Sequence, residues 1–172
     1  MAQFELVTTA SSQLWDFGWF DVSRFRVAHH TEATPTWQAS VRSFFADPIS
    51  QRRFCTSPDP WGAACGHHGP FQRERLDSEW FQVVPAGELV ARLRTSFDAD
   101  GFSEPPSEEQ QRPVLAWAAE AETRGDIVAE LIVPADRDAR VDRAEMVWIV
   151  FREYISFTAD GGELSVAVIG YD

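Results

Sequence analysis

The segment from Glu145 to Tyr171 constrains the fold more than any other part of the chain, because it is the most hydrophobic, β-branched and aromatic run. Two stretches, 146–158 and 163–171, have the composition of β-strands, and the Ala-Asp-Gly-Gly sequence between them is typical of a tight turn. We therefore predict a C-terminal β-hairpin at the centre of a sheet. A buried helix over 142–154 is the alternative, since a short apolar run fits either structure.

Alternation along the first of these strands separates its side chains into two sets. Phe151, Ile155 and Phe157 fall on one face, and Arg152 and Tyr154 fall on the other. Both faces are apolar in the first half of the strand, which predicts a central strand that is covered on both sides there.

The rest of the chain supplies shorter elements. Ser107 and Gln110 have the spacing of a capping box, but Pro113 would obstruct a helix that continued from them, so we expect that helix to begin at Pro113 and to end at Gly125. The sequence predicts strands at 4–9, 14–22, 24–30, 79–84 and 126–133, a turn at 10–13, helices at 34–46, 85–97 and 113–124, and loops at 47–70 and 98–106. This order predicts an α+β fold: a single domain over 1–172, with a mostly antiparallel sheet and about three helices packed on one face of it.

Charge is distributed unevenly along the chain. Of 172 residues, those from 1 to 97 include ten acids and nine arginines, a net charge of −1, and those from 98 to 172 include seventeen acids and six arginines, a net charge of −11. Such an acidic surface repels nucleic acid and anionic lipid and attracts basic partners.

The sequence has no evident leader with a basic start and an apolar core, and no evident membrane span. We therefore expect a cytoplasmic protein that binds neither nucleic acid nor membrane.

The leading functional hypothesis follows from this charge. We expect a non-enzymatic interaction protein that binds a basic protein partner, as inhibitor and immunity proteins do. The predicted partner-binding residues are the acids of the connections in the C-terminal part: Asp98, Asp100, Glu104, Glu108, Glu109, Asp136, Asp138 and Asp142.

A group of cysteines and histidines in the 47–70 loop offers a second kind of chemistry. Thiolates and imidazoles suit zinc, and Cys55, Cys65, His67 and His68 lie within fourteen residues of one another. Their spacing is not that of a zinc finger or ribbon, so the expected cofactor is none, with zinc as an alternative. A Cys55–Cys65 disulfide, or a cysteine nucleophile activated by a histidine, also stays open.

Two further functions remain as alternatives. One is a small-ligand-binding protein or an enzyme, with a pocket under the 47–70 loop lined by Trp15, Trp19 and Trp61. The other is a structural or assembly subunit, in which the many aromatic residues cover an interface.

The chain has no lysine and no glycine-rich phosphate motif, which excludes P-loop, Schiff-base and other lysine-dependent mechanisms. The oligomeric state stays open.

Overall fold

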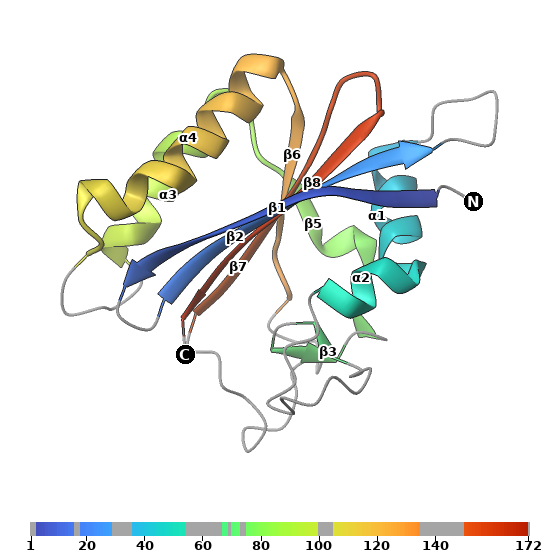
Figure 1. Cartoon of the computed structure of the whole chain (residues 1–172), viewed down its shortest axis with the longest axis horizontal. Coiled ribbons are helices and arrows are strands. Elements are labelled where there is room, and N and C mark those ends of the chain that lie inside the picture. The colour runs from blue at the N-terminus through green and yellow to red at the C-terminus, as the bar shows by residue number, and fades with distance from the viewer. Residues whose placement is uncertain are drawn as a thin grey trace.

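A computed structural model describes residues 3–15, 18–28, 36–53, 67–68, 70–72, 75–99, 105–134 and 150–171. In this part of the chain, a six-stranded antiparallel sheet has the order β1-β2-β8-β7-β6-β5 (Figure 1). Its strands are β1 (Gln3–Trp15), β2 (Gly18–Ala28), β5 (Phe81–Val83), β6 (Ile127–Leu131), β7 (Val150–Phe157) and β8 (Glu163–Tyr171). The helices are α1 (Trp37–Ala46), α2 (Pro48–Arg53), α3 (Leu89–Ala99) and α4 (Glu108–Arg124), a 3-10 turn η2 spans Ser78–Trp80, and β3 (His67–His68) pairs with β4 (Phe71–Gln72). The predicted α+β class is confirmed.

The C-terminal hairpin forms as predicted and lies inside the sheet. β7 and β8 pair from Val150↔Tyr171 to Phe157↔Leu164, and β8 pairs on its other side with β2. At the turn, Gly161 has a φ of 70°, where a glycine is unstrained. The Asp160 side chain fixes the turn because it accepts a 2.9 Å hydrogen bond from the Gly162 backbone N–H. The helix alternative is wrong from Val150 onward, and the predicted part of the strand before Val150 lies outside the described residues.

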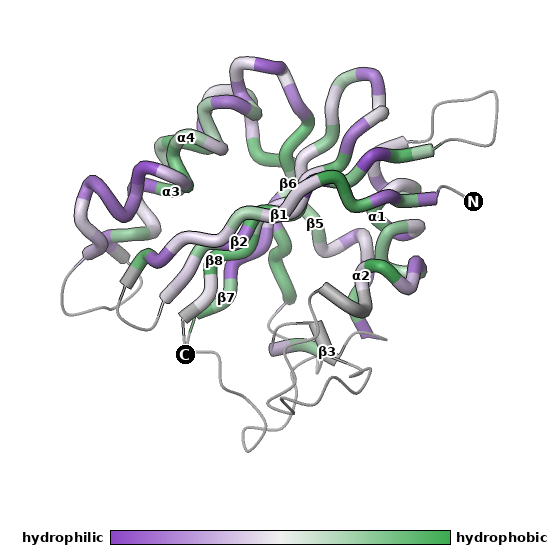
Figure 2. The backbone as a smooth tube through the Cα atoms, viewed as in Figure 1, coloured by the Kyte–Doolittle hydropathy of each residue, from purple (hydrophilic) through white to green (hydrophobic). Residues whose placement is uncertain are grey.

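The sheet is covered on both faces, so the expectation of helices on one face is wrong. One core lies under α3 and α4 and includes Tyr154, Ala167 and Ile169. The other lies under α1 and includes Ile155, Val166 and Val168. Successive residues of a strand point to opposite faces, so these two sets place helices on both sides, as Figure 1 also shows. Figure 2 shows that hydrophobic residues in β7 and β8, which lie between the helix pairs, alternate with more hydrophilic ones.

The polar stretch Ala10–Gln13 is strand rather than turn. β1 runs through it without interruption, and the Thr9 and Ser23 hydroxyl oxygens lie 2.9 Å apart across β1 and β2. Small polar residues suit an edge strand whose side chains face water, which is why their composition resembled that of a turn. Trp15 ends β1 and Gly18 begins β2, so the single strand predicted over 14–22 is divided between two strands, and a register shift lies between Gln13 and Trp15.

Part of the predicted 47–70 loop is helix α2. Asp47 ends α1 and also caps α2, because its side chain accepts a 2.9 Å hydrogen bond from the Ile49 N–H. Pro48 is the first residue of α2, the helical position at which proline is best tolerated. The predicted loop therefore begins with a helix at Pro48.

Helix α4 begins before Pro113, contrary to prediction. Ser107 and Gln110 form a capping box: the Gln110 N–H donates to the Ser107 hydroxyl (3.4 Å), and the Ser107 N–H donates to the Gln110 side chain (2.8 Å). The two hydrogen bonds, together with burial of Val114 and Trp117, outweigh the single helical hydrogen bond that Pro113 cannot donate. Gly125 ends the helix with a φ of 70°, as predicted.

Candidate functional site

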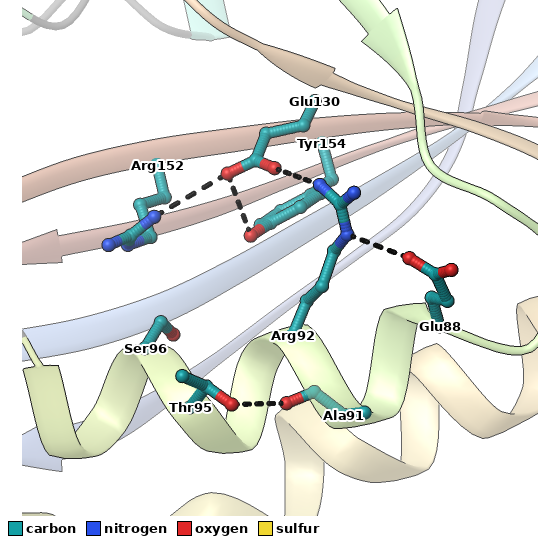
Figure 3. Close-up of a pocket in the computed structure, with 8 residues that line it drawn as sticks. All are labelled: Glu88, Ala91, Arg92, Thr95, Ser96, Glu130, Arg152 and Tyr154. Carbon is teal, nitrogen blue, oxygen red and sulfur yellow. Dashed lines mark hydrogen bonds and ion pairs between the residues drawn. The ribbon is translucent and has the colours of Figure 1, made fainter.

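A cavity of about 450 Å³ opens between α3 and the sheet (Figure 3). Glu88 and the α3 residues Ala91, Arg92, Thr95 and Ser96 line one side, and Glu130, Arg152 and Tyr154 of β6 and β7 line the other. Most of these side chains are charged or can form hydrogen bonds, although the cavity borders the hydrophobic core under α3 and α4.

Regular secondary structure brings these residues together. Glu130 and Tyr154 are direct partners in the antiparallel pairing of β6 with β7. Arg152 lies two residues before Tyr154 and therefore on the same face. On α3, Arg92 and Ser96 are four residues apart and lie on the same side of the helix, which faces these strands. The cavity walls are therefore held by backbone hydrogen bonds.

The Glu130 carboxylate is the centre of this site. One of its oxygens, Oε1, accepts a 3.1 Å hydrogen bond from the Tyr154 hydroxyl and lies 3.5 Å from Nη1 of Arg152. The other, Oε2, lies 3.6 Å from Nη1 of Arg92. Glu130 is only 7% exposed. A buried carboxylate requires such partners, because an unpaired charge away from water is costly.

The two arginines contact Glu130 from opposite sides and keep access to water. The Arg92 side chain is 46% exposed and the Arg152 side chain 30% exposed. Arg92 also reaches back to Glu88, with 3.5 Å between Nε and Oε2. All three contacts are longer than the 2.7–2.9 Å of strong charge-assisted hydrogen bonds. The printed contacts of Arg92 therefore hold its guanidinium group at Nε and Nη1 among the described residues.

Tyr154 closes the inner end of the cavity. Burial, and then the negative charge of Glu130, raise the pKa of Tyr154 well above its usual value, so its hydroxyl stays protonated and donates to the carboxylate. On the core side, its ring lies 6.2 Å from that of Trp117.

Two hydroxyl groups complete the lining on α3. The Thr95 hydroxyl donates to the Ala91 carbonyl (3.0 Å), and the Ser96 hydroxyl donates to the Leu93 carbonyl (2.8 Å). With their hydrogens directed to the helix backbone, their oxygens are left as acceptors at the cavity wall.

Three of the predicted partner-binding acids lie in the described part, and all are exposed. Asp98 lies in the last turn of α3, and Glu108 and Glu109 lie in the first turn of α4. The two helices are in contact, so these turns lie at the same end of the pair (Figure 1). The other predicted acids lie outside the described residues: Asp100, Glu104, Asp136, Asp138 and Asp142.

Three of the predicted metal and pocket residues, Cys55, Cys65 and Trp61, lie outside the described residues. His67 and His68 form β3, and within the described ranges no group of three or more His, Cys, Asp or Glu side chains could hold a metal ion. Trp15 and Trp19 lie in β1 and β2, and Trp19 does not line the cavity at α3.

Sequence reasoning missed the cavity, although part of the signal was present. Alternation already placed Arg152 and Tyr154 on one face, and Glu130 is a charged residue inside an apolar strand pattern. The pairing of β6 with β7 and the position of α3 over them depend on contacts between distant segments, which a single sequence does not reveal.

No protein-family model matches the chain, and comparisons with curated proteins and with solved structures find no match. Among the helices of the described ranges, none is both long and apolar enough to cross a membrane.

Proposed function

We propose that this protein binds a small molecule in the cavity between α3 and strands β6 and β7. The observation that carries the proposal is the convergence of Arg92, Arg152, Glu130 and Tyr154 on one concave site. The volume, about 450 Å³, is within the range of small-molecule sites. Such sites combine apolar surface with a few fixed polar groups, and here the apolar surface comes from Ala91 and from the carbon atoms of the longer lining side chains.

The energetics of the cluster also favour a binding role over a purely structural one. A buried ion pair contributes little net stability, because desolvation of the charges offsets their attraction. Packed apolar side chains between α3 and the sheet would stabilise the fold at least as well. Here the position is occupied instead by partly exposed arginines at long distances from their carboxylate, which suits groups that meet a ligand.

A thermal-shift screen of small metabolites tests the proposal. A ligand at about 100 times its Kd adds about 2.7 kcal/mol to the free energy of unfolding, which raises Tm by about 5–10 °C in a chain of this size. Ala91→Trp fills the cavity, and Ala119→Trp places the same side chain on an exposed position of α4. We expect the first variant to lose the response and the second to keep it. An equal response in both variants, or no response to any compound, would contradict the proposal.

Binding of a basic protein partner is the second candidate function. It is favoured by the net charge of −11 over residues 98–172 and by the exposure of Asp98, Glu108 and Glu109 at one end of the α3–α4 pair. A pull-down from the native host should recover a basic protein. Replacing Glu104, Glu108 and Glu109 with lysine should then slow association and weaken its dependence on salt, whereas Glu79→Lys, an exposed change outside this region, should have little effect. Recovery of no basic protein would remove this candidate.

A further inference from the structure

We infer that the ligand of this cavity is anionic and that its carboxylate or phosphate group is bound by Arg92 and Arg152. This inference rests on the proposed ligand-binding function and adds the chemical class of the ligand. It follows from which hydrogen-bonding groups of the cavity are already used and which are left.

The hydrogen-bonding capacity of the central carboxylate, that of Glu130, is largely used. Both oxygens of Glu130 face donors, from Tyr154 and Arg152 on one side and from Arg92 on the other. A cationic ligand would have to displace an arginine from a buried carboxylate, and the displaced charge would lose its partner. Glu130 therefore serves to position the two arginines and is a poor site for a cation.

Donor capacity remains on Arg92. A guanidinium group has five N–H donors, and the contacts of Arg92 with Glu88 and Glu130 involve only its Nε and Nη1 atoms among the described residues. Its side chain is 46% exposed. Arg152 approaches the same carboxylate from the other end of the cavity, with 30% of its side chain exposed. Figure 3 shows the two guanidinium groups on either side of Tyr154, an arrangement that suits an oxyanion between them.

The hydroxyl oxygens of α3 indicate a second feature of the ligand. Ser96 and Thr95 use their hydrogens on backbone carbonyls and offer acceptors to the cavity. A ligand with a hydroxyl or amine beside its anionic group would satisfy these acceptors and the arginines together. Recognition has to come from these local groups, because the net charge of −12 on the chain opposes the approach of an anion.

Isothermal titration calorimetry of the full chain with four probes tests this inference. Succinate and inorganic phosphate are the anionic probes and distinguish a carboxylate from a phosphate site; succinamide is the neutral analogue and 1,4-diaminobutane the cationic one. We expect an anionic probe to bind at least tenfold more tightly than succinamide, and 1,4-diaminobutane not to bind. Arg92→Gln and Arg152→Gln should each weaken anion binding at least tenfold. Arg94→Gln removes the same charge from an exposed α3 position that does not line the cavity, and should change the affinity less than twofold.

The outcomes separate the inference from the proposed function. Binding of succinamide or 1,4-diaminobutane at least as tightly as the anions would overturn the anionic class and leave the cavity as a ligand site. The absence of anion binding, or equal losses in the Arg94 and Arg92 variants, would overturn the inference as well. The proposed function is judged independently, by the response of Ala91→Trp in the metabolite screen. Circular dichroism of each variant shows that a loss of binding does not come from unfolding, and Arg92→Gln, at the more exposed arginine, keeps the test valid if Arg152→Gln fails to fold.

Discussion

Tyr154 and Glu130 are opposite one another on neighbouring strands, and the Tyr154 hydroxyl donates a 3.1 Å hydrogen bond to the buried Glu130 carboxylate. The pair joins the hydrophobic core under α3 and α4 to the cavity, because the Tyr154 ring belongs to that core while its hydroxyl reaches the polar cluster. The geometry of the proposed site and the stability of the fold therefore depend on the same contact.

Tyr154→Phe should lower the free energy of unfolding by about 1–3 kcal/mol, because it removes a hydrogen bond to a buried charged acceptor. The ring and its packing stay in place, so the change isolates the hydroxyl. Urea denaturation at pH 7 measures the loss. A variant as stable as the wild type would mean that water or another group satisfies Glu130 equally well.

The raised pKa of Tyr154 predicts a loss of stability at alkaline pH. A group whose pKa is higher in the folded state than in the unfolded state, where it is near 10, contributes its full stabilisation below about pH 10. This contribution declines as the pH rises above about 10 towards the pKa of the folded state. The difference in unfolding free energy between wild type and Tyr154→Phe should therefore shrink between pH 9 and pH 11. The chain contains no lysine, so few other groups titrate in this range. A difference in unfolding free energy that stays constant over this pH range would contradict this prediction.

Two substitutions near the start of α4 should change the free energy of unfolding in opposite directions. Ser107→Ala should destabilise by about 1 kcal/mol, because it removes the hydroxyl of the capping box. Pro113→Ala should stabilise by about 1–3 kcal/mol, because it restores a helical N–H donor. Arg112→Ala, at an exposed position beside the proline, is the control and should stay within about 0.5 kcal/mol of the wild type. Destabilisation by Pro113→Ala would show that the proline fits a local geometry that alanine does not.

Phe44→Ala tests the second core, under α1. Phe44 is fully buried, and its ring lies 5.0 Å from that of Phe25 and 5.3 Å from that of Phe4. Truncation of such a residue costs about 3–5 kcal/mol, whereas Gln38→Ala on the exposed side of the same helix should change little. Thermal denaturation compares the two variants. A small effect of Phe44→Ala would indicate that α1 is not firmly packed on the sheet.

The contrast between the hairpin and the cavity shows what a single sequence can predict. The hairpin follows from local chemistry, since alternation and the Asp-Gly turn both lie within one short segment. Helices were expected on one face of the sheet only, whereas β8 is buried on both sides, with Val166 in one core and Ala167 in the other. The predicted start of α4 is wrong because the capping box of Ser107 and Gln110 begins the helix despite Pro113.

The cavity, by contrast, depends on long-range pairing. Arg92, Glu130 and Arg152 come from three segments, and their meeting requires the register of β6 with β7 and the placement of α3 over both. The acidic residues of the C-terminal part carry a clear charge signal, but charge alone does not locate a concave site.

NMR chemical-shift mapping tests the central claim most directly, namely that the cavity between α3 and strands β6 and β7 is the ligand site. The compound with the largest thermal shift in the metabolite screen is titrated into uniformly 15N-labelled protein. We predict that the largest amide shift changes fall on Arg92, Ser96, Glu130 and Arg152, with little change in α1. Changes confined to α1 or to the start of α4, with the cavity residues unaffected, would contradict the claim.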